Sequence, residues 1–119
     1  MRTARNGQEG ARNAGHRHWH AGVSLAGRGD WSGAASAFDR ATRAAPQDPL
    51  YWVNLAHAQR RSGAPELALT AARRALQIEP AHVLALQLQA QCLSELHRYA
   101  DAVQATAFDT RAATLLPPT

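Results

Sequence analysis

The sequence contains no lysine, and all 13 of its basic residues are arginine. It has one cysteine, Cys92, so no disulfide can form within the chain, which suits a reducing compartment. No apolar run approaches the roughly 18 residues that a membrane-spanning helix needs. These absences exclude a disulfide-stabilised scaffold and a conventional membrane span. We therefore expect a cytoplasmic protein in which Cys92 is a small apolar filler.

The charge pattern argues against nucleic acid as a partner. The formal net charge of +4 could by itself suit phosphate groups. The arginines are scattered, however, and acidic residues such as Asp39, Glu66 and Asp101 stand among them. A solvated outer surface explains this pattern. The complete absence of lysine indicates the compositional bias of a GC-rich bacterial genome more than a selected binding surface.

The first residues differ in composition from the rest of the chain. Residues 1–14 contain three arginines, with glycine and asparagine between them, and no apolar segment. A secretory signal needs an apolar segment after its basic start. We therefore expect residues 1–14 to form a flexible basic N-terminal arm.

A period of 34 residues dominates the remainder. Pro46 and Pro80 are 34 residues apart, and Gly29 and Gly63 have the same separation. Two sets of small residues follow the same step, namely Gly22, Ala56 and Ala90, and Ala34, Ala68 and Ala102. A period of this length indicates a solenoid of repeated supersecondary units, which offers a surface for partners and no obvious pocket for chemistry.

The same residues predict an all-α fold built from helical hairpins. Helices approach closely only where side chains are small, so the first set of small residues should pack against the second. Gly29 and Gly63 suit the left-handed end of a helix, and Pro49 and Pro65 suit first helical turns. Alternating, strand-like stretches are missing from the sequence. We predict six helices, at about residues 16–28, 31–45, 49–62, 65–78, 83–96 and 99–113.

Counted from Gly15, Pro49 and Val83, the chain divides into three similar units. The second unit carries Trp52, Asn54, Leu55, Ala56, Gly63, Ala68, Ala72, Ala75 and Pro80. This pattern resembles the tetratricopeptide repeat. The resemblance implies an α-solenoid of three helix-turn-helix hairpins in a right-handed superhelix, with repeats at about residues 15–48, 49–82 and 83–116 and a tail at 117–119. The third unit departs from the pattern at Thr106, Asp109 and Thr114.

The resemblance also implies a concave groove formed by the first helix of each repeat. The residues expected to bind a partner there are His16, Trp19, Val23, Val53, His57, Arg60, Gln87 and Gln91. Such a groove suits an extended peptide or a helix from a partner protein. Trp19 would be its main anchor, unless its ring packs within the first hairpin. The function implied is a non-catalytic adaptor or scaffold that binds another protein.

One subclass of this family grips the C-terminal carboxylate of chaperones through a clamp of lysine, asparagine and arginine. At the positions that match this clamp, the chain has Trp19, Val23, Asn54, Leu84 and Leu88. Only Asn54 fits the clamp pattern. We therefore expect no carboxylate clamp and no binding of chaperone tails.

Motifs for catalysis, cofactors and metals are weak or missing. The serines stand in no nucleophile motif, the carboxylates form no obvious pair, and no glycine-rich loop follows a strand. His16 and His20 share a helical face at a spacing that suits two metal ligands, but no third ligand is evident nearby. We expect no enzyme activity, no cofactor and no metal site.

The last predicted helix carries an apolar stripe that no later helix would cover. Its residues are Ala105, Phe108, Ala112 and Leu115. Three explanations compete: the chain is the N-terminal part of a longer protein, the stripe pairs with another copy in a homo-oligomer, or it is a frayed end. In the first case, the repeats would recruit partners or drive oligomerisation for a larger bacterial enzyme such as a transferase.

Overall fold

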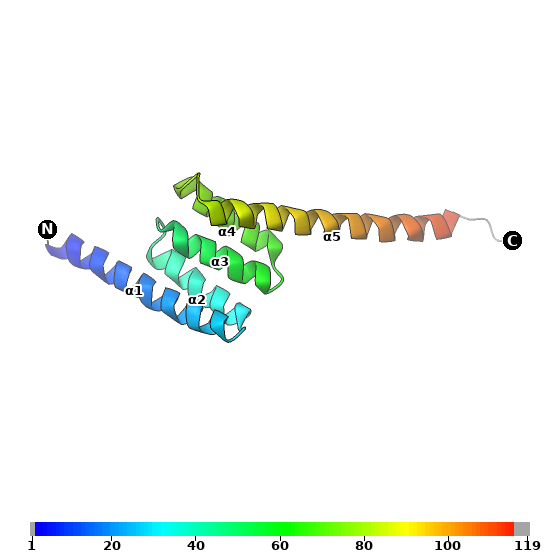
Figure 1. The fold of residues 1–119 in the computed structure, drawn as a ribbon. Helices are drawn as coiled ribbons and strands as arrows, with labels where there is room; N and C mark the ends of the chain where they lie inside the picture. Colours follow the sequence, from blue (N-terminus) through cyan, green and yellow to red (C-terminus); the bar gives the residue numbers. More distant parts are fainter. Residues whose placement is uncertain (1, 116–119) are drawn as a thin grey trace.

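The computed structural model describes the backbone of residues 2–115 and the side chains of residues 7–105, and this part of the chain is helical with short connections. The helices are α1 (Arg2–Gly27), α2 (Trp31–Ala44), α3 (Pro49–Arg61), α4 (Pro65–Ile78) and α5 (Val83–Leu115). The first four form two hairpins, and α5 packs on the second hairpin and then leaves the body of the molecule (Figure 1). The all-α prediction is confirmed. None of the described helices is both long and apolar enough to cross a membrane.

Glycines with positive φ make the two hairpin turns. Gly29 has a φ of 80° and Gly63 a φ of 90°, a region that glycine enters without steric cost. In the first turn the N–H of Asp30 donates to the carbonyl of Leu25 at 2.9 Å. In the second turn the N–H of Ala64 donates to the carbonyl of Gln59, also at 2.9 Å. These bonds satisfy carbonyls that a helix end leaves free. The predicted role of both glycines is therefore confirmed.

Proline and aspartate start the helices. Pro49 and Pro65 occupy first turns, where a missing N–H breaks no helical bond. The carboxylate of Asp48 caps α3 by accepting from the N–H of Leu50 at 3.0 Å. The indole Nε1 of Trp52 donates to the carbonyl of Pro46 at 2.8 Å. The hydrogen bond between Trp52 and Pro46 thus holds the loop before α3 against that helix.

Small residues lie where the paired helices approach most closely. Gly22 of α1 faces Phe38 of α2, and a Cβ added at Gly22 would lie 2.5 Å from the ring. Ala34, Ala56 and Ala68 are 0% exposed. The predicted burial of the small residues is therefore confirmed in the first two hairpins. Their size sets the distance between the helices of each hairpin.

The apolar core crosses helices α2 to α5. Phe38, Leu55, Leu69 and Leu88 are buried and belong to one contiguous cluster. Cys92 of α5 belongs to it as well and is fully buried, so its predicted role as an apolar filler is confirmed. Because these side chains come from consecutive hairpins, neither hairpin alone could bury them.

The predicted turn near residue 97 is wrong, because α5 continues unbroken to Leu115. His97 stands where the other units place Gly29 and Gly63, and a residue with a Cβ enters the left-handed region only at a cost. The imidazole of His97 lies 3.2 Å from the carboxylate of Asp101, one turn further on, and this spacing stabilises a continuous helix. The two helices predicted for the third repeat are thus one helix, and no third hairpin closes within the described residues.

The predicted start of the first helix is also wrong. We expected it at about residue 16, but α1 begins at Arg2, so residues 2–14 of the predicted arm have a helical backbone. Alanine, arginine, glutamine and glutamate favour helix in this segment, and each glycine costs only about 1 kcal/mol.

A substitution at Gly22 tests the close approach within the first hairpin. We expect Gly22→Ala to destabilise the fold by about 1–3 kcal/mol, because the new methyl group would displace the ring of Phe38. Gly10→Ala is the matched control in the same helix, since nothing lies within 4 Å of a Cβ there. It should be neutral or stabilise by up to about 1 kcal/mol. Urea unfolding of both variants measures the difference, and equal stabilities would contradict the packing.

Candidate functional site

A groove runs between α3 and α5. Its cavity has a volume of about 340 Å³. Helix α3 contributes Val53, Asn54, His57 and Arg60, and α5 contributes Leu84, Gln87, Leu88 and Gln91. On each helix most of these residues are three or four positions apart, so they share one face. The packing of α5 beside α3 brings the two faces together.

The groove has an apolar floor and a polar rim. Val53 and Leu88 are buried at its base, whereas Gln87 and Gln91 are exposed along α5. Each glutamine amide has donors and an acceptor, which can pair with the N–H and carbonyl groups of a peptide backbone. An apolar floor with amides above it suits an extended segment or a helix with one apolar side.

A hydrogen-bonded ion pair joins the two helices at one end of the groove. Nε of Arg60 donates to Oε1 of Glu95 at 2.7 Å, and both side chains are partly exposed. A pair in contact with solvent contributes little stability. Its effect is positional, because it holds the guanidinium of Arg60 between α3 and α5 while other N–H groups remain to donate.

His57 lies at the same end of the groove, next to an aromatic side chain of the first hairpin. Its ring meets Trp31 edge to face, with centroids 5.2 Å apart, and the guanidinium of Arg61 lies 4.9 Å from the ring centre of Trp31. His57 is exposed overall, but partial burial of its ring, followed by the charges of Arg60 and Arg61, lowers its pKa from the ordinary value of 6.5. Near neutral pH the imidazole is therefore uncharged, and it offers a donor and an acceptor.

The residues predicted from the first repeat lie elsewhere. His16 and Val23 are exposed on α1, and neither they nor Trp19 line the cavity between α3 and α5. Trp19 is half-buried against the core, with ring centroids 5.7 Å from His16 and 6.4 Å from His20. Its indole Nε1 is buried and has no hydrogen-bond partner among the described residues. The structure thus brings together the predicted residues of the second and third units only.

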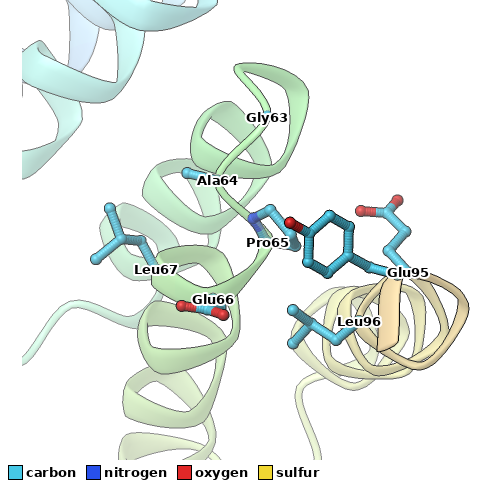
Figure 2. Close-up of a pocket in the computed structure, with 8 residues that line it drawn as sticks. Gly63, Ala64, Pro65, Glu66, Leu67, Glu95 and Leu96 are labelled. Atoms are coloured by element: carbon cyan, nitrogen blue, oxygen red, sulfur yellow. The ribbon is translucent and has the colours of Figure 1, made fainter. Parts of the chain in front are cut away.

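Three features of this region are missing from the predicted groove. Asn54 and Leu88 also line the cavity, although on sequence they were candidates only for a carboxylate clamp. Glu95 follows Arg60 by 35 residues, one more than the period, so the repeat spacing did not indicate this pair. A larger cavity of about 560 Å³ lies between the start of α4 and α5, lined by Gly63, Ala64, Pro65, Glu66, Leu67, Glu95, Leu96 and Tyr99 (Figure 2).

The remaining candidate residues can also be placed. Ala105 is exposed on α5, and Phe108, Ala112 and Leu115 lie outside the described side chains. The rings of His16 and His20 have centroids 6.2 Å apart, and no group of three or more possible metal ligands occurs among the described residues.

Burial, reinforced by Glu95 and opposed by Arg60, raises the pKa of Cys92. This thiol stays protonated at neutral pH, so it is a poor nucleophile.

Stacked hairpins with a groove along their first helices define a helical repeat protein. A sequence profile described as tetratricopeptide repeat matches residues 11–116. The chain therefore belongs to the tetratricopeptide repeat family, as the resemblance predicted. No curated protein matches it.

Solved structures of tetratricopeptide repeat domains have the same fold. The second TPR of Spaghetti (RPAP3), bound to the HSP90 peptide SRMEEVD, has a TM-score of 0.72 at 18% identity, covering 82% of this chain and 89% of that one. The Arabidopsis OM64 TPR domain has a TM-score of 0.71 at 23% identity, covering 92% and 87%. The TPR2AB domain of yeast Sti1 in complex with pHSP90 has a TM-score of 0.71 at 20% identity, covering 87% and 41%.

The lowered pKa of His57 predicts a loss of stability in mild acid. Below its ordinary pKa of 6.5 the unfolded chain protonates this histidine, whereas the folded protein does so only at lower pH. The unfolded state then binds more protons, so its free energy falls relative to that of the folded state. We expect the melting temperature to decrease as the pH falls below 6.5, and His57→Gln to remove part of this decrease.

Thermal melts followed by circular dichroism over a pH series measure this effect. His20→Gln is the control. It removes an exposed histidine of α1, and so measures how far the loss of any one histidine changes the pH dependence. Equal changes in the pH dependence of the two variants would contradict the special position of His57.

Proposed function

We propose that the chain is a non-catalytic protein-binding module, an adaptor or scaffold, that holds a segment of a partner protein in the groove between α3 and α5. The single observation that carries this proposal is the shared groove face made by Val53 and His57 of α3 with Gln87 and Gln91 of α5. Membership of the tetratricopeptide repeat family supports it. So do the similar domains of Spaghetti (RPAP3) and Sti1, which were solved with HSP90 peptides.

The chemistry of the groove favours a ligand with apolar side chains and a free backbone. The floor of Val53 and Leu88 can receive apolar side chains, and Leu84 on the rim extends this surface. Gln87 and Gln91 can bond to the ligand backbone, as a peptide in an extended conformation requires. Arg60 is the cationic group of the groove, and it is already paired with Glu95. The groove therefore suits an internal peptide segment better than a free carboxylate.

Substitution of the two rim glutamines tests the groove. Peptides are selected against the wild-type chain from a random displayed library, and their affinity is then measured by fluorescence anisotropy. We expect Gln87→Ala with Gln91→Ala to weaken binding by about tenfold or more, because two ordered amide contacts are lost. Gln47→Ala, in the loop before α3, is the matched control and should bind as the wild type does. Unchanged affinity in the double variant would contradict a ligand in this groove.

The peptide SRMEEVD tests the absence of a carboxylate clamp. At the positions that match the clamp, Val23, Leu84 and Leu88 are apolar, and Leu88 is also buried. These side chains cannot donate hydrogen bonds to a terminal carboxylate. We expect no saturable binding of SRMEEVD by isothermal titration calorimetry, with or without a C-terminal amide. Micromolar binding that requires the free carboxylate and is lost in Asn54→Ala would show that a clamp exists.

A further inference from the structure

Helix α5 exposes an apolar stripe on a different face from the groove. Its residues, which we call the α5 stripe, are Val83, Leu86, Ala90 and Leu93. They recur at intervals of three or four and so share one side of the helix. Val83 is 65% exposed, and Leu86 and Leu93 are each 44% exposed. Exposed apolar residues grouped on one face of a helix are typical of an interaction site.

The same repeat positions are covered in the first two hairpins. Ala90 is in register with Gly22 and Ala56, and both of these are buried. In the first hairpin the cover comes from the second helix, because Phe38 of α2 lies against Gly22. Within the described residues, α5 has no second helix of its own repeat. Ala90 is thus exposed at a position that both closed hairpins bury, and the equivalents of Leu86 and Leu93 in those hairpins are half-buried.

The chain itself is poorly suited to cover the α5 stripe. The segment that would form the second helix is the continuation of α5, which is straight through the expected turn (Figure 1). If that segment folded back, Thr106 and Asp109 would take the repeat positions of Phe38 and Ala41, which are buried in the first hairpin. Burying an unpaired carboxylate there would cost free energy.

We propose that α5 of a second copy of this chain packs antiparallel against the α5 stripe, along the full length of both helices. Each copy then supplies the covering helix that the other lacks. The 33 residues of α5 span about 50 Å, and the second half projects beyond the body of the molecule (Figure 1). An antiparallel pair related by a twofold axis is a closed, isologous arrangement.

The residue order along α5 supports this pairing. Full antiparallel overlap brings Val83 opposite Leu115, Leu86 opposite Ala112, Ala90 opposite Phe108, and Leu93 opposite Ala105. Every residue of the α5 stripe thus meets one of the residues predicted for self-association. At three of these four positions a large residue stands opposite a small one, as interdigitating helices require. This register is the one in which the two described helices overlap along residues 83–115.

The polar side chains near the centre of the helix also fit. The same register brings His97 opposite Asp101 of the partner subunit, and the twofold axis repeats this contact. Both side chains are exposed, and within one chain they lie 3.2 Å apart. No like-charged pair meets at these positions, so the centre of the pairing is free of direct repulsion.

Two leucine substitutions of the same kind test the pairing. Analytical ultracentrifugation over a concentration series should show a monomer–dimer equilibrium for the wild type. We expect Leu86→Glu, in the α5 stripe, to raise the dimer dissociation constant about 30-fold or more. Leu84→Glu is the matched control, because Leu84 is 54% exposed on the same helix but lines the groove. It should leave the dimer unchanged. A monomer at all concentrations, or equal weakening by both variants, would overturn the proposal.

Disulfide trapping tests the register without relying on a disruptive substitution. In a Cys92→Ala background, one preparation carries His97→Cys and a second, differently tagged, carries Asp101→Cys. On mixing and mild oxidation, we expect the mixed disulfide to form in preference to either homodimer. Predominance of the two homodimers, which a parallel pairing would give, or the absence of any cross-link, would overturn the proposed arrangement.

Discussion

The close approach of paired helices at small residues is the constraint on which the rest of the structure depends. Where Gly22 meets Phe38, there is no room for even one methyl group. Ala56 and Ala68 occupy the equivalent region of the second hairpin and are fully buried. This spacing lets each hairpin act as a rigid unit. The units then stack, bury a common core, and place α3 beside α5.

Helix α5 connects the two surfaces that we propose to be functional. Its first half packs on the second hairpin, with Gln87 and Gln91 in the groove and Leu86 and Leu93 on another face. Because the two faces are separate, occupation of the groove does not cover the α5 stripe. A partner peptide and a second copy could therefore bind at the same time, and the groove of each copy would remain open in a dimer.

The predicted groove residues lie together where the repeat pattern is complete and apart from one another where it is not. Val53, His57, Arg60, Gln87 and Gln91 lie together because α3 and α5 keep the regular repeat spacing. The first unit has histidine at the usual tryptophan position, and Trp19 next to it packs against the core. The pairing of Arg60 with Glu95 was also missed, because its spacing differs from the period by one residue.

The sequence by itself determined the helical hairpins, the glycine turns and the family, because each depends on local propensity and on a period that repeats along the chain. Only the tertiary structure decided that the third turn is missing. His97 is compatible with a turn on a sequence reading, but in the structure its imidazole lies beside Asp101 one turn further on and α5 continues as one helix. Tertiary contacts also decided the depth of the groove, since it arises only where α3 and α5 meet.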